Sequence, residues 1–422
     1  MVPSNPVMFA ISMFIQIFSL LIGGYYLFVS LFGWIPKKDK TQPSGSKKYS
    51  YALLVSAHNE EMVIAQLIES LKRQNYDKDC YDIFVIADNC TDNTANVARE
   101  AGAIVYERFN DTLKGKGFAL EWMFDKLFKM EKQYDYIAIF DADNLVDPNF
   151  LTEMNIQANK GHKVVQGYID SKNPFDSWIT CAYSFSFWSI SRVFQLARYN
   201  LGLSCQLSGT GFIINTETLK ELGWGATCLT EDMEFTMKLA LNHERVAWAH
   251  NAIVYDEKPL TLAQSWRQRV RWMQGHVDVA SRFWTKLVKQ AIKEKDPVCF
   301  DCSVYLIQPV RVIAMGFITF MAWAQTFYPD GNLGFVQMDY LFKNPIIWNA
   351  FVAIQFLYMP AVIAFERKQF NARMFIGYIT YFVYSLTWVP ITIQGFINKN
   401  KTEWSHTVHT RQISIDDFVS KQ

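Results

Sequence analysis

The chain has 422 residues, and its 41 basic and 40 acidic side chains leave a formal net charge of +1. With no excess of positive charge, the sequence gives no reason to expect binding to nucleic acid, whose phosphates attract strongly basic proteins. The seven cysteines are an odd number and are scattered along the chain, which favours reduced structural thiols over a disulfide framework.

The chain opens with an uncharged run from residue 6 to residue 34. This run is long enough to cross a hydrocarbon core of about 30 Å, for which a helix needs roughly 20 residues. Lysines within residues 37–40 follow it, so the positive-inside rule places the N-terminus outside and the next residues in the cytosol. We therefore expect residues 1–35 to form a transmembrane helix and residues 36–49 to form a polar linker.

Residues 50–280 alternate between strand and helix signals. The runs YALLVSA (51–57), DIFVIA (82–87) and YIAIF (136–140) are apolar and short, as in strands buried on both faces. Helical patterns separate them, which predicts a doubly wound α/β sheet that binds its ligands beyond the carboxyl ends of its strands. The first strand is not followed by G-x-G-x-x-G, so dinucleotide binding is not expected.

Acidic residues stand at the ends of the predicted strands, and Asp141 and Asp143 follow the strand YIAIF two positions apart. Alternate residues of a strand face the same way, so the two carboxylates could share a divalent cation. The alternative is a pair of helix-capping or solvated loop acids.

A second acidic pair, Glu231 and Asp232, stands where another helix is expected to begin. These residues are either acids favoured by the helix macrodipole or a general base in a cleft. Further on, the stretch QRVRW (268–272) combines planar cations with an indole shortly before the chain becomes apolar.

The motifs HNEE, ADNCTDNT, KGKG, DAD, TED and QRVRW occur in this order over residues 58–272. This series resembles the membrane-embedded, processive family 2 glycosyltransferases that make cellulose, mixed-linkage glucan, chitin, poly-N-acetylglucosamine or hyaluronan. The resemblance implies a GT-A-type nucleotide-sugar-binding domain over residues 50–280, inserted between transmembrane helices.

The resemblance also implies a role for each motif residue. The residues implied to bind the nucleotide-sugar donor are His58, Glu60, Asp88, Lys114, Lys116, Asp141, Gln268 and Arg271. Asp141 and Asp143 would hold Mg²⁺ or Mn²⁺, and Asp232, beside Glu231, would be the catalytic base. Acceptor binding falls to Ser208, Gly209, Thr210 and Trp272, and a gating role to Trp404 and Thr407 in W-x-x-T spacing.

Three more apolar runs lie near residues 304–328, 345–365 and 374–397. We expect an interfacial helix and transmembrane helices over residues 281–397, and a gating-loop-like tail over residues 398–422. Four full crossings from an external N-terminus would leave this tail outside, although we expect it in the cytosol. Pro390 interrupts the last run, so the second half of that run could lie in the interface or re-enter.

Together these features predict a multi-pass protein of the cell membrane with a cytosolic catalytic domain. Its partners would be a UDP-sugar, a growing polysaccharide and the lipid bilayer. We expect it to polymerise UDP-glucose with inversion into a β-glucan and to secrete the polymer through its own channel. The alternatives are a polymerase of UDP-N-acetylglucosamine, a non-processive transferase that makes a polyprenyl-linked sugar, and an inactive scaffold for polysaccharide assembly.

Overall fold

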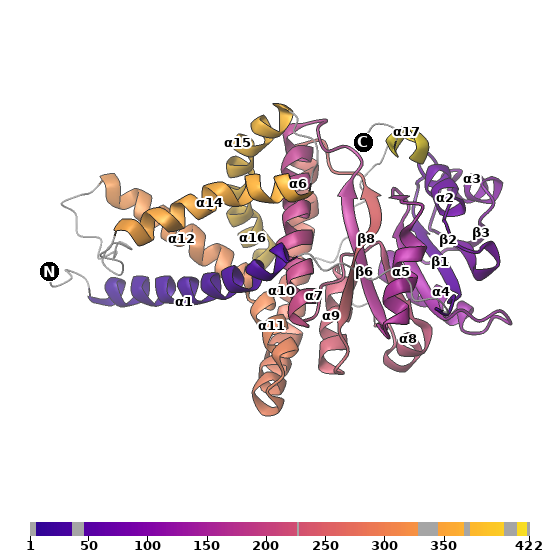
Figure 1. Cartoon of the computed structure of the whole chain (residues 1–422), viewed down its shortest axis with the longest axis horizontal. Helices are drawn as coiled ribbons and strands as arrows, with labels where there is room; N and C mark the ends of the chain where they lie inside the picture. The colour runs from indigo at the N-terminus through magenta and orange to yellow at the C-terminus, as the bar shows by residue number, and fades with distance from the viewer. Residues whose placement is uncertain are drawn as a thin grey trace.

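The computed structural model describes residues 6–35, 46–225, 228–327, 345–366, 372–400 and 412–419. Three parts follow one another along the long axis of the molecule (Figure 1). A sheet with its covering helices occupies one end, a layer of helices runs crosswise behind it, and a bundle of long helices extends away from that layer.

The eight strands of the sheet follow the order β3-β2-β1-β4-β7-β6-β8-β5. Their bounds are β1 Tyr51–Ala57, β2 Tyr81–Asp88, β3 Ile104–Arg108, β4 Tyr136–Asp141, β5 Leu145–Val146, β6 Val164–Ser171, β7 Phe212–Asn215 and β8 Val246–Asp256. Strands β3, β2, β1 and β4 are parallel, as the doubly wound prediction requires.

The other half of the sheet differs from that prediction, because β7 runs antiparallel to both β4 and β6. The antiparallel direction places the start of β7 at the carboxyl end of β4, where the amide of Gly211 donates to the carbonyl of Ile139 at 2.8 Å. The loop of residues 208–211 therefore lies beside the acidic residues that follow β4.

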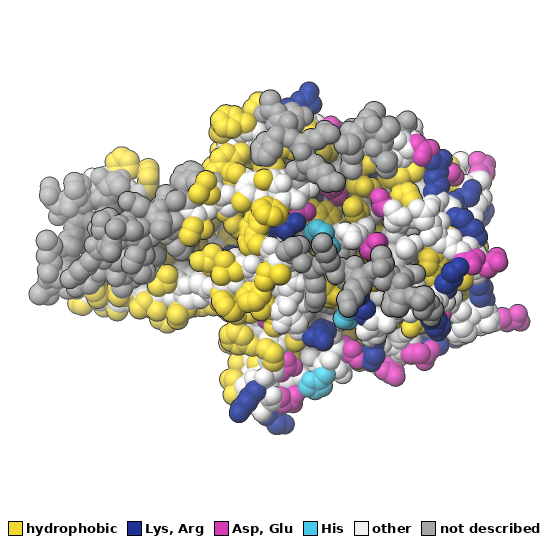
Figure 2. Space-filling model, in the orientation of Figure 1, with side chains coloured by type: hydrophobic (Ala, Val, Ile, Leu, Met, Phe, Trp, Pro, Cys, Tyr) yellow, Lys and Arg dark blue, Asp and Glu magenta, His cyan; other side chains and the backbone are white. Residues whose placement is uncertain are grey.

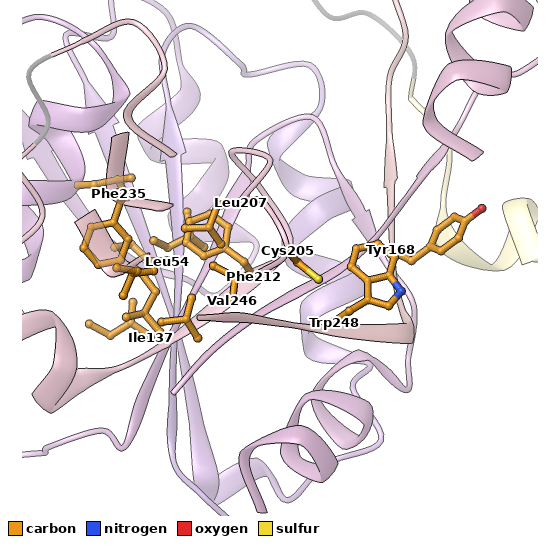
Figure 3. Close-up of a cluster of buried hydrophobic side chains, with 14 of the residues drawn as sticks. Leu54, Ile137, Tyr168, Cys205, Leu207, Phe212, Phe235, Val246 and Trp248 are labelled. Atoms are coloured by element: carbon orange, nitrogen blue, oxygen red, sulfur yellow. The ribbon is translucent and has the colours of Figure 1, made fainter. Parts of the chain in front are cut away.

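Helices cover both faces of the sheet, and the strands bury both sets of side chains. Helices α2 (Ile64–Lys72) and α5 (Phe150–Asn159) pack on one face, and α3 (Thr94–Glu100) lies beside α2. On the other face pack α4 (Lys116–Leu127), α8 (Thr216–Leu222) and α9 (Glu231–Leu241). In Figure 3, Leu54, Ile137 and Phe212 from adjacent strands pack together with Phe235 of α9. The continuous apolar runs of the strands follow from this burial on both faces.

Behind the sheet lie α6 (Trp178–Ser189), a π-helical segment over Ile190–Leu196, and α7 (Ala197–Leu201). The same crosswise layer holds α10 (Leu262–Glu294), α15 (Ala372–Leu386) and α16 (Trp388–Ile397). Helix α10 has 33 residues and is therefore about 50 Å long. It continues without a break past residue 280, where the catalytic domain was expected to end.

Helices α1 (Pro6–Leu31), α12 (Gln308–Phe327) and α14 (Pro345–Glu366) extend away from the sheet, and α11 (Pro297–Leu306) leads into α12. Figure 2 shows hydrophobic side chains gathered on this half of the molecule and charged side chains on the other. By length and composition, two helical stretches among the described residues are able to cross a membrane, 6–34 and 373–397. The bent pair of 297–306 and 308–321 would make a third.

Two buried ion pairs fasten the long helices to the rest of the molecule. Arg198 of α7 contacts Asp301 of α11, with both side chains fully buried. Arg192 of the π-helical segment contacts Glu366 at the end of α14, and the hydroxyl of Tyr168 in β6 also donates to Glu366 at 2.9 Å.

A short C-terminal helix, α17 (Ile415–Val419), packs on the sheet domain. Ile415 and Phe418 join Leu145 of β5 and Tyr255 of β8 in one apolar cluster. Residues near the end of the chain therefore lie against the same domain that holds the strands.

Candidate active site

A cavity of about 1990 Å³ lies at the carboxyl ends of β1, β2 and β4. Every predicted site residue that the structure describes lines it: His58, Glu60, Asp88, Lys114, Lys116, Asp141, Asp143, Ser208, Gly209, Thr210, Glu231, Asp232, Gln268, Arg271 and Trp272. Trp404 and Thr407, predicted to gate the site, lie outside the described residues.

At one end of the cavity, His58 and Asp88 follow β1 and β2. The Nδ1 atom of His58 lies 2.7 Å from the carbonyl oxygen of Asp88, so the two strand ends are joined. The Asp88 carboxylate is buried and accepts from Arg108 at 2.5 Å, and Arg108 also donates to the carbonyl of Leu113. Arg108 was not among the predicted residues, because the last residue of the exposed strand β3 carries no motif.

The two lysines of KGKG have different positions. Lys116, at the first turn of α4, forms an ion pair with Asp141 and donates to the carbonyl of Gly209 at 2.6 Å. Lys114 is 60% exposed and lies 3.9 Å from Asp111. Only Lys116 therefore reaches the acidic centre of the cavity.

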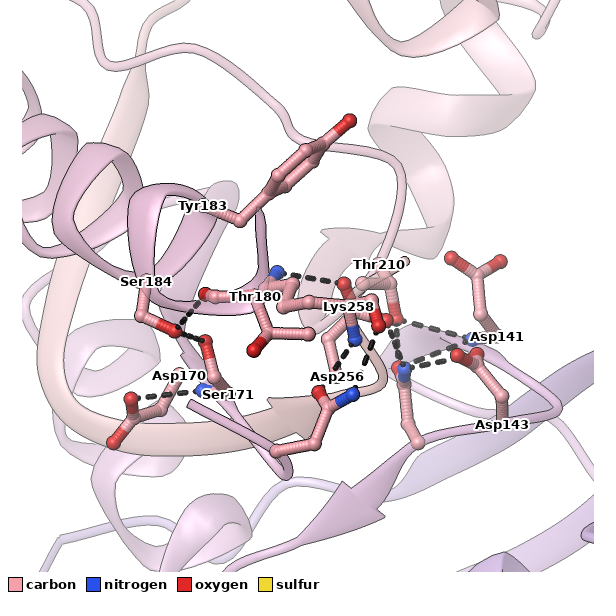
Figure 4. Close-up of polar contacts among 12 residues, drawn as sticks. Asp141, Asp143, Asp170, Ser171, Thr180, Tyr183, Ser184, Thr210, Asp256 and Lys258 are labelled. Carbon is pink, nitrogen blue, oxygen red and sulfur yellow. Dashed lines mark hydrogen bonds and ion pairs between the residues drawn. The ribbon is translucent and has the colours of Figure 1, made fainter. Parts of the chain in front are cut away.

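Asp141 is the last residue of β4, and Asp143 follows two positions later. A polar network surrounds both residues (Figure 4). The Thr210 hydroxyl accepts from the backbone amide of Asp141 at 3.0 Å and donates to Asn144. The Asn144 amide group donates to Asp143 at 3.2 Å and to Asp256 at 3.3 Å. Sequence reasoning missed Asn144, although it directly follows the D-x-D motif.

The network continues from Asp256 at the end of β8. Its carboxylate accepts from Lys258 at 2.7 Å, and the Lys258 side chain is buried with its ammonium 3.4 Å from the ring centre of Phe187 in α6. Asp256 also lines the cavity. Residues 141–144, called the acidic loop below, are thereby connected to the crosswise helices. No motif in the sequence predicts this connection.

The donor set at Asp141 and Asp143 fits a hard divalent cation, since carboxylate oxygens are the ligands that Mg²⁺ and Mn²⁺ take. Among the described residues no group of three or more His, Cys, Asp or Glu is placed to hold a metal. The protein would therefore offer two carboxylates and leave the remaining positions to a ligand and water.

Glu231 and Asp232 form the first turn of α9 and face the same cavity. A Cβ atom built on Gly209 would lie 3.6 Å from Oδ2 of Asp232, so this carboxylate lies against the loop that Lys116 contacts. Burial and then the negative charge of Glu231 raise the pKa of Asp232 to about 7. Burial likewise raises the pKa of Glu231.

The QRVRW stretch lies on α10, which places Gln268, Arg271 and Trp272 on the cavity wall. Gln268 accepts from the Tyr183 hydroxyl at 3.0 Å. The Nε atom of Arg271 is buried without a hydrogen-bond partner in the described part of the chain, and this leaves a donor for a ligand.

Arg269, from the same stretch, does not enter the cavity. Its guanidinium is fully buried at 4.2 Å from the ring centre of Tyr384 and 5.0 Å from that of Trp388, and it donates to Thr387 at 2.8 Å. It therefore joins α10 to the junction of α15 and α16, through cation–π contacts with two rings. Arg267 is exposed.

The cavity continues from the carboxylates toward the long helices, where its lining becomes apolar. Tyr26 of α1, Met315, Phe320 and Trp323 of α12, Tyr358 of α14 and Leu386 of α15 belong to this part. Phe320, Trp323 and Leu386 leave more than half of their surface accessible. One cavity thus joins the ionisable groups at the strand ends to an apolar part among the long helices.

A family model described as glycosyltransferase like family 2 matches residues 49–275, more than half of the chain. The chain belongs to this family. It is an enzyme of the nucleotide-sugar-dependent glycosyltransferases, and the motifs from HNEE to QRVRW fall within the matched residues.

Curated relatives of this family 2 chain include the probable glycosyltransferase YdaM of Bacillus subtilis, 25% identical over 93% of this chain and 94% of the relative. The β-monoglucosyldiacylglycerol synthase of Nostoc sp. is 27% identical over 66% of this chain and 60% of the relative. The poly-β-1,6-N-acetyl-D-glucosamine synthase of Staphylococcus epidermidis is 26% identical over 56% and 57%, respectively.

Among solved structures, the mannosyltransferase PcManGT of Pyrobaculum calidifontis, in complex with GDP-Man and Mn²⁺, superposes with a TM-score of 0.62. The match covers 93% of this chain and 99% of that one at 16% identity, so the likeness concerns the fold. It supports a GT-A-like α/β fold together with its helices.

Proposed function

We propose that this chain transfers a sugar, with inversion, from a UDP-sugar to the hydroxyl group of an acceptor at a membrane surface. The observation that carries the proposal is the position of Asp232. It faces the cavity across Lys116 from the D-x-D carboxylates, and its raised pKa suits a base that works near neutral pH.

The donor would lie along the carboxyl ends of the strands. His58, Glu60 and Asp88 would hold the uridine, with the Asp88 carboxylate held in place by its ion pair with Arg108. Lys116 and Arg271 would contact the diphosphate. A guanidinium suits this group because its donors form a fixed fork. Mg²⁺ or Mn²⁺ at Asp141 and Asp143 would act as a Lewis acid that stabilises the diphosphate charge.

In the transfer itself, Asp232 takes the proton of the acceptor hydroxyl. The acceptor oxygen forms a bond to the anomeric carbon on the face opposite the nucleotide. The bond from that carbon to the diphosphate oxygen breaks, and its electron pair leaves with UDP. Attack from the opposite face turns an α-linked donor into a β-linked product.

For the acceptor we propose a growing β-glucan made from UDP-glucose, with UDP-N-acetylglucosamine as the second candidate donor. Trp272 would support the terminal sugar, and Ser208, Gly209 and Thr210 would form the wall beside it. Residues 1–35 and the helices of 281–397 would anchor the protein in the cell membrane with the catalytic domain in the cytosol. A gating role for Trp404 and Thr407 stays a prediction.

A lipid acceptor is the second candidate function, and the apolar end of the cavity favours it. Phe320, Trp323 and Leu386 line this end with accessible apolar side chains, against which an acyl or polyprenyl chain would lie. The named activity of the Nostoc relative, the synthesis of a glucosyl lipid, agrees with this candidate.

The test uses the full-length chain in detergent with Mn²⁺ and radiolabelled UDP-glucose or UDP-N-acetylglucosamine, with and without diacylglycerol or polyprenyl phosphate. A polymer that a linkage-specific glycanase digests supports the first candidate, and an organic-soluble labelled lipid supports the second. Asp232→Asn serves as the control and should lower either product by about 10²–10⁴. Product formation by Asp232→Asn at the wild-type rate would overturn the assignment of the base, and absence of any product would contradict both candidate functions.

A further inference from the structure

Helix α12 contains a single charged residue, Arg311, which stands in its first turn. Arg311 lines the cavity, where its Nε atom donates to Gln308 at 3.1 Å and its guanidinium lies 4.9 Å from the ring centre of Tyr26 in α1. Among the described residues it forms no ion pair, whereas Arg192 and Arg198 are each paired with a buried carboxylate. A cation in an apolar helix is costly without a counter-ion, and such residues commonly mark the path of a substrate.

The donors of Arg311 indicate which kind of counter-ion suits this part of the cavity. The two terminal amino groups of its guanidinium have no hydrogen-bond acceptor in the part of the chain that the structure describes. A guanidinium is a planar fork of donors, and a phosphate group accepts two such bonds at once. A phosphate group therefore matches what Arg311 offers.

A second polar group of the cavity wall also lacks a partner. The Oε1 atom of Gln206 is buried with no hydrogen bond to the described residues, and the Nε2 atom lies 4.0 Å from the sulfur of Cys302 in α11. Gln206 stands two positions before the loop of residues 208–211, which lies against Asp232. Its oxygen is thus placed between the candidate base and α11, which leads into α12, and would accept from a hydroxyl group of a ligand.

Beyond Arg311, one face of α12 continues along the cavity. The residues of this face that line the cavity are Val312, Met315, Gly316, Thr319, Phe320 and Trp323. Residues three and four positions apart lie on the same side of a helix, so these side chains form one stripe. From Arg311 to Trp323 the stripe is about 18 Å long, at the rise of an α-helix. It is cationic at one end and mainly apolar along the rest, which matches a ligand with an anionic group and an apolar chain.

We propose that the cavity binds a phospholipid with a hydroxylated head group, whose phosphate contacts Arg311. The head-group hydroxyls lie toward Gln206 and Asp232, and an acyl chain lies along α12 from Met315 to Trp323. The proposal rests on the transfer reaction proposed above and specifies the chemical class of its lipid acceptor. Neither a neutral glycan nor diacylglycerol supplies a counter-ion for Arg311, so the phospholipid is favoured over both.

The first test measures the binding of radiolabelled phosphatidylglycerol to the full-length chain in dodecyl maltoside, without donor or metal. Arg311→Gln removes the charge and should weaken binding by about 10–100-fold, the typical loss for hydrogen bonds to a charged group. Arg311→Lys keeps the charge and should lose less. Equal binding by Arg311→Gln and the wild-type protein would overturn the proposal.

Arg267→Gln is the matched control, because Arg267 of α10 is exposed and does not line the cavity. This variant should bind phosphatidylglycerol as the wild-type protein does. Equal losses in Arg267→Gln and Arg311→Gln would show a general attraction for anionic lipid and would overturn the proposal. Binding of UDP with Mn²⁺ checks that the sheet domain of each variant is intact.

The second test is competition on the wild-type protein, which does not depend on the folding of a variant. Unlabelled phosphatidylglycerol should displace the labelled lipid. Glycerol phosphate and diacylglycerol at the same concentration should not, because each supplies only one part of the ligand. Displacement by glycerol phosphate would mean a site for free anions, and displacement by diacylglycerol would mean a site that does not recognise charge. Either result would overturn the proposal.

Transfer to phosphatidylglycerol is measured separately, with UDP-glucose or UDP-N-acetylglucosamine and Mn²⁺. If the lipid binds through Arg311 but no glycosylated lipid forms, the binding site stands and the proposed reaction fails. If Arg311→Gln and Arg267→Gln form glycosylated lipid equally well, the reaction stands and the phosphate site is wrong.

Discussion

Asp232 and Glu231 stand next to each other on the cavity wall, and each charge affects the other. Because the base must be ionised, kcat/KM should rise as the pH increases through about 7, the pKa of Asp232. The charge of Glu231 raises that pKa, whereas the charge of Lys116 lowers it. The pH dependence of the two variants below therefore identifies the group that titrates.

In Glu231→Gln the acidic limb of the kcat/KM profile should move to lower pH, because one negative neighbour has been removed. In Lys116→Met the limb should move to higher pH, because a positive neighbour has been removed. Both profiles are measured from UDP release over a pH series. Shifts of the two variants in the same direction would contradict the assignment of Asp232 as the titrating base.

Asn144 donates to Asp143 from a buried position, and this side chain should set how tightly the acidic loop holds a cation. Loss of a partner that orients a metal ligand typically costs about 10–100-fold in metal affinity. We expect Asn144→Ala to weaken Mn²⁺ binding by such a factor, measured by electron paramagnetic resonance in the presence of UDP.

Asn155→Ala is the control for this variant. Asn155 is equally buried but bonds to Tyr51, Tyr49 and Lys47 near the start of β1, at the opposite end of the strand from the acidic loop. Its removal should leave Mn²⁺ affinity unchanged. Equal losses in both variants would mean that the effect comes from the core and not from the acidic loop.

At the scale of elements, α10 carries the site on one part of its surface and the α15–α16 layer on another. Trp272 packs against Tyr183 and lines the cavity. Trp272→Ala should reduce chain elongation more than the hydrolysis of the nucleotide sugar, because donor and metal residues remain in place. Polymer yield and UDP release, measured side by side, test this, and equal losses in both would argue against a platform for the acceptor.

The contact between α16 and α10 depends on the absence of a side chain at Gly395. Gly395→Leu would force the two helices apart, and overpacking of this kind costs typically about 1–3 kcal/mol. We expect Gly395→Leu to have a lower Tm than the wild-type protein in detergent, as measured by tryptophan fluorescence. Gly24→Leu on α1 is the control, since no atom of the described residues lies within 4 Å of an added Cβ there, and its Tm should not change.

At the scale of the whole molecule, the pair of Arg198 and Asp301 joins the sheet domain to the long helices, and the Tyr25 hydroxyl of α1 donates to Asp301 at 2.8 Å. Asp301→Asn would leave a buried guanidinium without its counter-ion, which typically costs about 3–5 kcal/mol. The double variant Arg198→Met/Asp301→Leu removes both charges. Its Tm should lie above that of Asp301→Asn, and a lower value would show that the charges themselves are needed.

The sequence predicts the parallel half of the sheet well, because strands buried on both faces read as short apolar runs such as YALLVSA. It also predicts the residues around the cavity, since Asp88, Asp141 and Asp143 follow such strands directly. The direction of β7 is not predictable in this way, because the four residues of FIIN would suit either direction. The burial of Arg269 is not predictable either. An arginine in a basic helix gives no sign that Tyr384 and Trp388, more than 100 residues further along the chain, pack against its guanidinium.

The orientation of α15 and α16 illustrates the limit for whole segments. Hydropathy records how apolar a stretch is, and residues 373–397 are apolar enough to cross a bilayer. It does not record which neighbours the stretch meets, and here the small residues Gly377 and Gly395 decide that it packs along α6 and α10.

The guanidinium of Arg282 in α10 donates two hydrogen bonds to the carboxylate of Glu234 in α9, at 2.6 and 2.9 Å. This contact joins the first turn of α9, which also holds Asp232, to α10 at a point about three turns beyond Arg271 and Trp272. We therefore expect Asp232 and Trp272 to move together, which would keep their spacing through a catalytic cycle. Among the described residues no ion pair ties Lys116 to α10, so we expect displacement during donor entry and UDP exit on the Lys116 side of the cavity.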